Sequence, residues 1–580
     1  MDSHELVVHT ESLTKRYGRV LALDGLSLDV RAGEVVGFLG PNGAGKTTTL
    51  RLLLGYLRPT AGGARVHGLD CWRDTVAVHA RTGYLPGDLR LWPRMSTQAI
   101  AAHLARLRGL VHDPSTADLA KRLDLDLDRP VGELSKGNRQ KAGIVLALLG
   151  DPQLLLLDEP TSGLDPLVQQ EFHRMLWERA EAGAAVLLSS HILSEVERVA
   201  DRVGDRPRGP PANDREPRRA ARKGPAHRGG AVRLGAAPGR IRWRAGDHRR
   251  TAGRQRAALH HAGGRRSADQ GAGALPRPGP ELPRGGPGGH LPGPVRRGGR
   301  EVSAISAARA GIATRGEVIR HTLRAGRRPL AIWAAAFAVL VAIYAVIWPS
   351  VRGNASWRNL FDTLPQTYRA LFTASGTIDL STPAGYLGVE LMGFLGPALI
   401  AVYAITAGSA AIAGEEDRGG LEVTLSAPVS RTQLLAQRFI ALVIGVAVLA
   451  VATGAAMWVF SAMLGMGLGL DQIASAAAAL GIFGLFCGAT ALAVGAATGR
   501  PAVARGVAAL TAVASYLINA LAQITSALRA LRPISPYYLA LGNEPLAHGL
   551  RMIGAVSVLA AAAAIVIAGG VLFSRRDLGC

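Results

Sequence analysis

Six long apolar stretches in the second half of this 580-residue chain constrain its fold more than any other feature. Each reaches the roughly 20 residues that a helix needs to cross the hydrocarbon core of a bilayer. Because lipid offers no hydrogen-bond partners, backbone in a membrane must form helices or closed barrels, and stretches of this length predict an all-α membrane domain. They cover residues 329–348, 386–411, 439–463, 474–498, 506–526 and 552–573.

Arginines at both ends of this apolar region indicate its orientation. With an even number of spans both ends lie on one side, and the positive-inside rule makes that side the cytoplasm. The loop near 464–473 has no Lys or Arg and should face outward, whereas three arginines in the fifth loop fit less well. The N-terminus lacks the basic start and apolar core of a signal peptide, so insertion depends on the internal stretches. The flanking residues are Arg324, Arg327, Arg328, Arg575 and Arg576.

The formal net charge of +23 comes mostly from one segment. Residues 204–300 contain 22 Arg, one Lys and six acidic residues, together with 21 Gly and 13 Pro. No hydrophobic periodicity survives there, so we predict a disordered linker over 204–301. Its charge permits an alternative function as a nucleic-acid or anionic-lipid binding module. Trp243 is its only aromatic residue and no binding motif is recognisable, so we expect no nucleic-acid partner.

Residues 1–203 alternate short apolar runs with helical patterns, which is typical of a parallel α/β sheet. After the run VVGF comes a turn that matches the P-loop pattern, and a helical stretch follows it. The glycines let backbone N–H groups wrap phosphates, Lys46 should contact the β/γ-phosphates, and Thr47 should hold Mg²⁺. The nucleotide-binding residues predicted here are Gly40, Pro41, Asn42, Gly43, Ala44, Gly45, Lys46, Thr47 and Thr48.

A second apolar strand, LLLL at 154–157, ends in two carboxylates. Asp158 is placed to hold Mg²⁺, usually through water, and Glu159 is placed to orient or deprotonate the attacking water. On its own such a pair would more often be a polar strand terminus. Downstream of a P-loop it favours a catalytic role. The three cysteines lie too far apart to suggest a zinc site or a disulfide framework.

Between these motifs the run LSKGNRQ at 134–140 opens a helix. It resembles the signature motif of ABC ATPases, usually LSGGQ, and keeps Ser135 and Gly137. In that family the motif meets the γ-phosphate held by a partner subunit, so the resemblance implies a homodimer in which two cassettes close face to face. A plain serine N-cap is the alternative.

Further positions follow the order of the ABC ATPase motifs. Tyr17 stands where that family stacks an aromatic ring on adenine, Asp165 ends a run that resembles the D-loop, and His191 matches the switch histidine that senses γ-phosphate. The alternatives are an ordinary sheet tyrosine and a satisfied polar histidine. The sequence departs from the family at Gly87, where a glutamine is common, and Asp88 is the nearest substitute for its metal contact.

The loop after the second apolar stretch joins an acidic-Arg-Gly start (415–420) to a Pro-x-x-Arg segment (428–431). It resembles the cytoplasmic loop of ABC-2 type permeases, which docks on the ATPase; a solvated charged loop is the alternative. Residues 535–538 and 543–546 also look like this family, particularly its actinobacterial branch linked to antibiotic export. Glu390, near the start of the second stretch, is the main candidate for a functional intramembrane charge.

The basic segment has the composition that a GC-rich gene yields when it is read out of frame. The ABC resemblance stops at Val203, and allowed codon choices read one base later restore a sequence resembling the missing ATPase tail. Residues 301–303 can be encoded GAA-GTG-AGC, in which a TGA stop overlaps a GTG start at Val302. One frameshift near 203 would thus fuse two adjacent genes. A true fusion through a basic linker is the alternative.

These resemblances imply an α/β P-loop NTPase (an ABC cassette, 1–203), the linker (204–301), and a six-helix ABC-2 type transmembrane permease (302–580). They imply a multi-pass protein of the cell membrane that exports its substrate by hydrolysing ATP. Its ATPase domain would lie in the cytoplasm and use ATP and Mg²⁺. The expected partners are a second cassette, the membrane and a transported small molecule. Export of a lipophilic drug or antibiotic-like compound rests on family analogy alone.

Overall fold

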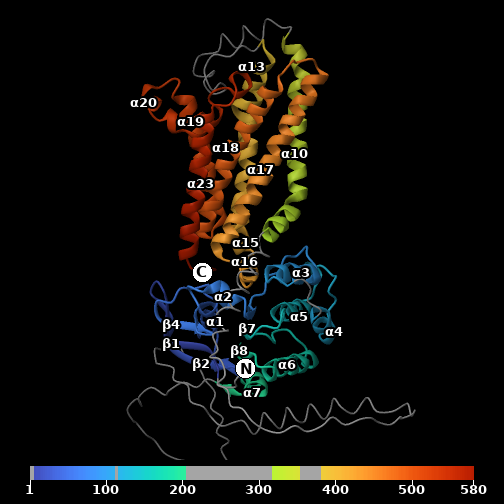
Figure 1. Ribbon diagram of the computed structural model, residues 1–580, viewed down its shortest axis with the longest axis vertical. Coiled ribbons are helices and arrows are strands. Elements are labelled where there is room, and N and C mark those ends of the chain that lie inside the picture. The colour runs from blue at the N-terminus through green and yellow to red at the C-terminus, as the bar shows by residue number, and fades with distance from the viewer. Residues whose placement is uncertain (1–4, 111–114, 204–315, 353–380, 580) are drawn as a thin grey trace, which may run out of the picture.

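The computed structural model describes residues 5–110, 115–203, 316–352 and 381–579. They form two bodies stacked end to end, an α/β domain (5–203) and a helical domain (316–579), as Figure 1 shows. The predicted disordered linker and the segment that we interpret as out of frame lie outside the described residues.

A five-stranded parallel sheet forms the centre of the α/β domain. In four of its five strands every residue is buried, which explains why these segments read as continuous apolar runs. The fifth strand, at the edge of the sheet, pairs with its neighbour at only two positions, Val36↔Arg202 and Gly37↔Val203. In spatial order the strands are β6 (Thr82–Leu85), β7 (Leu154–Asp158), β8 (Ala185–Ser190), β3 (Val35–Leu39) and β9 (Arg202–Val203).

A second, antiparallel sheet has four strands. Apolar side chains that alternate along its two long strands, among them Val8, Leu13 and Leu26, are fully buried, as expected for a sheet with one face on the core. In spatial order its strands are β2 (Val20–Arg31), β1 (Leu6–Tyr17), β4 (Ala61–Val66) and β5 (Leu69–Asp70).

Helices pack around these sheets, and capping residues fix where several of them start. Ser96 accepts the Ala99 N–H to cap α3, and Asp165 caps α6, which has Pro166 at its first position. The helices of the α/β domain are α1 (Lys46–Leu53), α2 (Thr75–His79), α3 (Thr97–Leu107), α4 (Ser115–Arg122), η1 (Val131–Glu133), α5 (Lys136–Ala147), α6 (Pro166–Glu181) and α7 (Leu193–Val199).

Six helical spans in the described residues are long and apolar enough to cross a membrane, which confirms the predicted number. The second span contains a π-helical segment, η2, between two α-helical ones. The spans are α10 (Glu317–Arg352), α13 (Pro383–Leu387) with η2 (Gly388–Leu395) and α14 (Gly396–Ala411), α17 (Arg431–Met463), α18 (Leu470–Thr498), α19 (Pro501–Leu521) and α23 (Met552–Arg575).

The predicted bounds of several spans were wrong, because hydropathy marks only the apolar part of a helix. The first span begins at Glu317, not at 329, and Figure 1 shows its lower end bending toward α3; Pro329 inside the helix is a physical cause for such a bend. The third span begins at Arg431, not at 439. The fifth runs over Pro501–Leu521 and ends before the predicted 526.

Small residues let the membrane spans approach closely. A Cβ on Gly408 of α14 would lie 2.3 Å from the carbonyl oxygen of Gly488 on α18, so these two backbones meet with no room for a side chain. Close approach through small residues is the usual way that helices pack in lipid. The short helices that connect the spans are α15 (Ala413–Asp417), α16 (Gly420–Leu425), α20 (Ser526–Arg529), η3 (Arg532–Ile534), α21 (Pro536–Leu541) and α22 (Pro545–His548).

Candidate functional site

The glycine-rich turn between β3 and α1 has the shape of a phosphate cradle. Gly43 and Gly45 have φ angles of +83° and +84°, in the region that favours glycine. A Cβ on Gly45 would lie 2.6 Å from the Ala22 carbonyl oxygen, whereas one on Gly43 would meet nothing within 4 Å. One side of the turn is therefore packed and the other open. Since α1 starts at Lys46, the unpaired N–H groups of its first turn also lie here.

Lys46 connects this turn to the end of β7. Its side chain is buried, and its Nζ donates to the Gly40 carbonyl oxygen and lies 3.2 Å from Glu159 Oε1. The two residues are 113 positions apart in sequence, but β3 and β7 both lie in the parallel sheet, each paired with β8. Carboxyl ends of parallel strands meet at one edge of a sheet, which is where ligands bind in such folds.

Thr47 and Asp158 offer oxygen ligands suited to Mg²⁺. Thr47 Oγ1 donates to Asp158 Oδ2 at 2.6 Å, and Ser189 Oγ donates to Asp158 Oδ1. A hydroxyl and a carboxylate are hard oxygen donors, as Mg²⁺ prefers, and Mg²⁺ usually completes its shell with water and phosphate. The described residues contain no group of three or more His, Cys, Asp or Glu that could hold a metal without such help. The residues present therefore fit a Mg²⁺ ion that arrives with a nucleotide.

Glu159 is held in a strained backbone conformation. Its φ is +49°, which costs a non-glycine residue about 1–2 kcal/mol. Its N–H is fixed by the Ser189 carbonyl oxygen at 3.1 Å and by Ser189 Oγ at 3.2 Å. Its Oε2 lies 2.7 Å from His191 Nδ1. Strain of this kind is concentrated at active sites. The structure thus brings Glu159 and His191 together, and their catalytic roles stay predictions.

The structure contradicts the expectation that Asp88 takes over the metal contact of the missing glutamine. Asp88 is 77% exposed and pairs with Arg90 at 2.8 Å. Gly87 is the residue that lies beside the site, because a Cβ there would come within 3.1 Å of Asp158 Oδ2. A side chain at position 87 would crowd Asp158. With glycine at this position, the backbone can lie close to the Asp158 carboxylate.

The remaining predicted residues lie apart from the turn. Ser135 Oγ accepts the Asn138 N–H and caps α5, and its contact with a nucleotide stays a prediction. A Cβ on Gly137 would lie 2.8 Å from the Gly163 carbonyl oxygen, which places the signature-like run beside the D-loop-like run. Among the described residues, no hydrogen bond or ion pair joins Ser135 to residues 40–48. Tyr17 ends β1, and its ring centroid lies 5.2 Å from Lys15 Nζ.

The acidic loop of the helical domain docks on the α/β domain, as predicted. Figure 1 shows α15 and α16 at the junction of the two bodies. Arg51, in the last turn of α1, pairs with Glu422 Oε1 of α16 at 2.7 Å, and the Tyr56 hydroxyl donates to the Glu422 carbonyl oxygen at 2.8 Å. Burial raises the pKa of Glu422, and the attraction of Arg51 opposes that rise. The helix that follows the P-loop thus contacts the membrane domain directly.

A second contact comes from the segment that follows Gly87. Arg90 donates to the Asp417 carbonyl oxygen at 3.4 Å, and Trp92 Nε1 donates to Glu415 Oε1 at 3.3 Å. A Cβ on Gly419 would lie 2.7 Å from Arg90 Cδ, so this loop is packed tightly on the α/β domain. The contacts of this segment with the membrane domain are therefore made by an arginine and a tryptophan, three and five positions after Gly87.

Arg431, the last residue of the Pro-x-x-Arg segment, ties three parts of the molecule together. Its guanidinium donates to the Gly55 and Tyr56 carbonyl oxygens at 3.0 and 3.3 Å. It also donates to the Phe573 carbonyl oxygen at 3.1 Å and lies 5.1 Å from the Trp72 ring centroid. The guanidinium donates to a fourth carbonyl oxygen, that of Arg576. Its five N–H donors in a fixed planar fork can serve all four carbonyls, whereas a lysine ammonium has three donors.

The start of α10 makes a further contact with α3. Glu317 pairs with His103 at 3.2 Å and with Arg106 at 2.8 Å, and the His321 ring stacks on His103 at 4.4 Å between centroids. Burial lowers the pKa of His103, and the hydrogen bond that its ring donates to the Glu317 carboxylate opposes that effect.

Sequence reasoning missed the contact residues on the α/β side, namely Arg51, Tyr56, Trp92 and His103. No motif marks them. Their signal is weak: Arg51 is a basic residue in the last turn of α1, and Tyr56 is a buried tyrosine in a segment that reads as apolar core.

Two family descriptions match this chain. Residues 23–162 match the family described as ABC transporter, and residues 317–578 match the family described as ABC-2 family transporter protein. The chain belongs to the ABC transporter family. It is a multi-pass membrane protein in which an ATP-binding cassette is joined to an ABC-2 membrane domain.

Named relatives of this ABC transporter match its cassette. The bacitracin transport ATP-binding protein BcrA of Bacillus licheniformis is 37% identical over 202 residues, which cover 34% of this chain and 66% of that protein. The Nod factor export ATP-binding protein I of Paraburkholderia xenovorans is 36% identical over 211 residues, covering 34% and 67%. The chain thus spans about two thirds of each relative's length. A solved ATP binding subunit of an ABC transporter is 29% identical with a TM-score of 0.32, covering 34% of this chain and 83% of that one.

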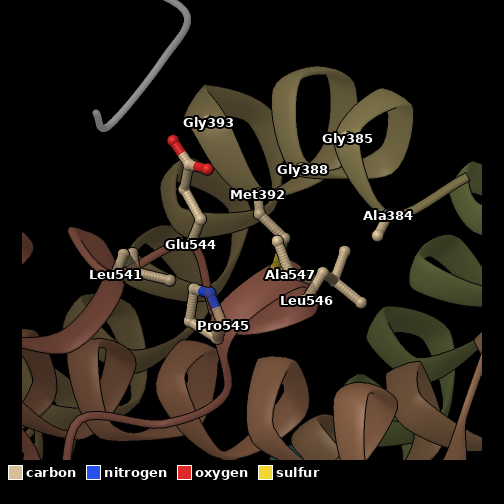
Figure 2. Close-up of a pocket in the computed structure, with 10 residues that line it drawn as sticks. All are labelled: Ala384, Gly385, Gly388, Met392, Gly393, Leu541, Glu544, Pro545, Leu546 and Ala547. Carbon is tan, nitrogen blue, oxygen red and sulfur yellow. The ribbon is translucent and has the colours of Figure 1, made fainter. Parts of the chain in front are cut away.

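On the membrane side, both motifs of the transporter's last third lie against η2. The Tyr537 hydroxyl donates to the Gly393 carbonyl oxygen of η2. Figure 2 shows Glu544, Pro545 and Leu546 beside α13 and η2, around a small cavity. Its volume of about 20 Å³ is room for a water molecule and not for a transported compound. Glu390 lies in η2 and is exposed, so its functional role stays a prediction.

Proposed function

We propose that this transporter uses ATP hydrolysis in the cassette to export a lipophilic, drug- or antibiotic-like small molecule. The observation that carries the proposal is the meeting of Lys46, Thr47, Asp158, Glu159 and His191 at one edge of the parallel sheet. The helix that starts at this edge, α1, carries Arg51 in its last turn, and Arg51 contacts the membrane domain. A nucleotide site connected directly to membrane helices is the arrangement that energy coupling requires.

In this proposal each residue has one task. The N–H groups of the glycine-rich turn and Lys46 hold the phosphates, and Thr47 and Asp158 hold Mg²⁺, which supplies charge neutralisation when it is bound. Glu159 orients the attacking water and accepts its proton. His191, 2.7 Å from Glu159, keeps that carboxylate in place. Tyr17 stacks on adenine, and its neighbour Lys15 limits how the ring can turn.

Two copies of the chain are needed for a complete site. Ser135 and Gly137 lie beside the D-loop-like run of their own cassette, and within the described part of the chain no polar contact connects Ser135 with the turn at 40–48. We infer that they meet the nucleotide of a second copy, with Asp165 in the adjoining loop. ATP then closes the two cassettes, and hydrolysis separates them.

The same proposal places the cassette in the cytoplasm. Arg324, Arg327 and Arg328 of α10 and Arg575 and Arg576 of α23 lie at the helix ends on the cassette side of the membrane domain. Positive residues favour the cytoplasmic side. The segment between the helical pair α17 and α18 (464–469) is at the opposite end and has no Lys or Arg, which supports the same orientation.

The direction and class of substrate are supported by relatives and not by a binding pocket. Two of them are named for bacitracin transport and for Nod factor export.

We also propose that the join between cassette and membrane domain arose by a frameshift. The two family matches leave residues 163–316 unassigned, and this interval includes the basic segment 204–300. The working assembly would then be separate ATPase and permease subunits.

Substitution Glu159→Gln tests the ATPase assignment. It keeps the size of the side chain but removes the base, so ATP turnover should fall by about 100-fold or more. Binding of a fluorescent ATP analogue should persist, because Lys46 and the turn are intact. The matched control is Glu181→Gln, an exposed glutamate at the end of α6, which should turn over ATP like the wild type. Wild-type turnover in Glu159→Gln refutes the proposed function.

A further inference from the structure

The four residues that follow α23, Arg576–Gly579, lie against the cassette, and we call them the α23 extension. Its first residue stays with the membrane domain. The Arg576 guanidinium binds Glu416, with Nη1 at 2.9 Å from Oε1, and its Nε donates to the Ala496 carbonyl oxygen at 2.6 Å. This anchor fixes where the extension leaves the membrane and directs the next three residues onto the cassette.

Asp577 enters a polar site on the cassette. Its carboxylate pairs with Lys15 Nζ and accepts the backbone N–H of Arg58 at 2.7 Å. Lys15 is 4% exposed, and its Nζ also donates to the Arg58 carbonyl oxygen at 2.8 Å. An ammonium so deeply buried is strongly unfavourable without a carboxylate partner, and Asp577 is that partner. With the extension in place, Lys15 and the Arg58 N–H thus form a polar site that fits an acidic side chain.

Leu578 and Gly579 fill the neighbouring positions. Leu578 is 1% exposed and donates its N–H to the Tyr56 carbonyl oxygen at 3.0 Å. Gly579 has a φ of +63°, and a Cβ on it would lie 3.2 Å from Glu422 Oε1. Its carbonyl oxygen accepts from Arg51 Nη1 at 3.2 Å. The site thus favours an acid, then a large apolar side chain, then glycine.

This contact is linked to the nucleotide site by two short routes. Lys15, which holds Asp577, lies 5.2 Å from the ring of Tyr17, the proposed adenine-stacking residue. Arg51, which holds Gly579, is in the last turn of α1, the helix that begins with Lys46. The extension therefore contacts cassette elements that would carry the adenine and the phosphates.

We propose that the cassette has a receptor site for the acid-leucine-glycine peptide of the α23 extension, bordered on one side by Glu416 of α15 and Glu422 of α16. Lys15 and the Arg58 N–H recognise the acid, the core around Tyr56 takes the leucine, and Arg51 with Glu422 closes on the glycine. The peptide attaches the end of the last membrane helix to the cassette. It does so whether the two domains are one chain or two, and the attachment requires no hydrolysis.

Hydrogen exchange of the full-length chain in lipid nanodiscs, without nucleotide, tests this site. Asp577→Ala and Leu578→Asp should speed exchange in the segment 55–60 about tenfold, since each removes an interaction that holds the extension to this backbone. Asp577→Asn should have a smaller effect, because its amide oxygen still accepts from Arg58. The matched control is Arg575→Ala, an exposed arginine next to the extension, which should leave the exchange unchanged.

Unchanged exchange at 55–60 in both Asp577→Ala and Leu578→Asp overturns the proposal. Faster exchange spread evenly over the parallel sheet also overturns it, because a docking site must respond locally. If Leu578→Asp prevents folding, Asp577→Ala and Asp577→Asn carry the test. A chain that hydrolyses no ATP still reports on this contact, so failure of the proposed function and failure of the receptor site are distinguishable.

Discussion

Replacing Arg431 by alanine is expected to loosen the cassette from the membrane domain while leaving the nucleotide site intact. Arg431 donates to two carbonyl oxygens of the cassette, those of Gly55 and Tyr56, and lies over the Trp72 ring. None of these groups belongs to the proposed catalytic set. The same guanidinium also holds the end of α23 through the Phe573 carbonyl oxygen. The substitution therefore removes the hydrogen bonds that connect α17 to α23 and those that connect α17 to the cassette.

The magnitude follows from these contacts. A hydrogen bond from a charged donor contributes about 1.5–3 kcal/mol. The Gly55 bond, at 3.0 Å, has good geometry, and the Tyr56 bond, at 3.3 Å, is weaker. A cation–π contact at 5.1 Å adds about 1 kcal/mol. The cassette attachment should then lose about 3 kcal/mol, which is roughly a 100-fold change in the docking equilibrium. Arg431→Lys keeps the charge but loses the planar fork, so about a tenfold change is expected.

The assay combines two measurements on the full-length chain. Hydrogen exchange at residues 55–58 reports docking, and ATP turnover in nanodiscs reports the nucleotide site. Cellular accumulation of the dye Hoechst 33342 serves as a transport probe. We expect faster exchange and higher dye accumulation in Arg431→Ala, with basal ATP turnover retained. Arg418→Ala is the matched control, since Arg418 lies in the same loop and is exposed.

Arg431→Ala with wild-type exchange at 55–58 would refute the reasoning, because the guanidinium would then contribute nothing to docking. Loss of basal ATP turnover in the same variant would also count against it. That result would mean that Arg431 supports the catalytic geometry itself, not the attachment of the membrane domain.

Two further predictions concern acid stability and the gene. Burial lowers the pKa of His79 to about 4, and its Nε2 lies 2.7 Å from the Leu54 carbonyl oxygen. In the unfolded chain a histidine has a pKa of about 6.5. The free energy of unfolding that the neutral His79 contributes above that pH is therefore lost as the pH falls toward 4. The expected loss is about 2 kcal/mol between pH 7.5 and 5. Thermal unfolding of the cassette at the two pH values measures this loss. His79→Gln should reduce the loss and exposed His548→Gln should not; equal pH dependence of His79→Gln and the wild type contradicts the prediction. DNA sequencing across codons 195–305 in an independent isolate should show an insertion or deletion near codon 203, and an unbroken frame rules out the frameshift.

Local sequence patterns were sufficient for the nucleotide edge of the cassette. The glycine-rich turn, the strand ending in Asp158 and Glu159, and His191 are each short motifs bound to one strand end. Because parallel strands bring their carboxyl ends together, the order of the motifs implies that they meet. The six membrane spans were equally readable, since crossing a bilayer demands a run of apolar residues that no soluble segment needs.

Long-range contacts could not be read in this way. Arg51 and Glu422 are 371 positions apart, and Lys15 and Asp577 are 562 apart. No local periodicity records which charged residues of one domain face those of the other. The extension of α10 to Glu317 was missed for a related reason, because its charged first turns are stabilised by α3 and not by lipid.

The sequence alone therefore determined the two kinds of domain in this transporter and the residues that we propose for its nucleotide site. Both follow from chemistry that acts within a few residues: backbone N–H groups around phosphate, and apolar length in lipid. Only the tertiary structure decided how the domains are joined. Asp88 pairs with Arg90, and Arg431 donates to four carbonyl oxygens. Asp577 of the α23 extension pairs with Lys15 of the cassette. Those contacts depend on surfaces that exist only after both domains have folded and met.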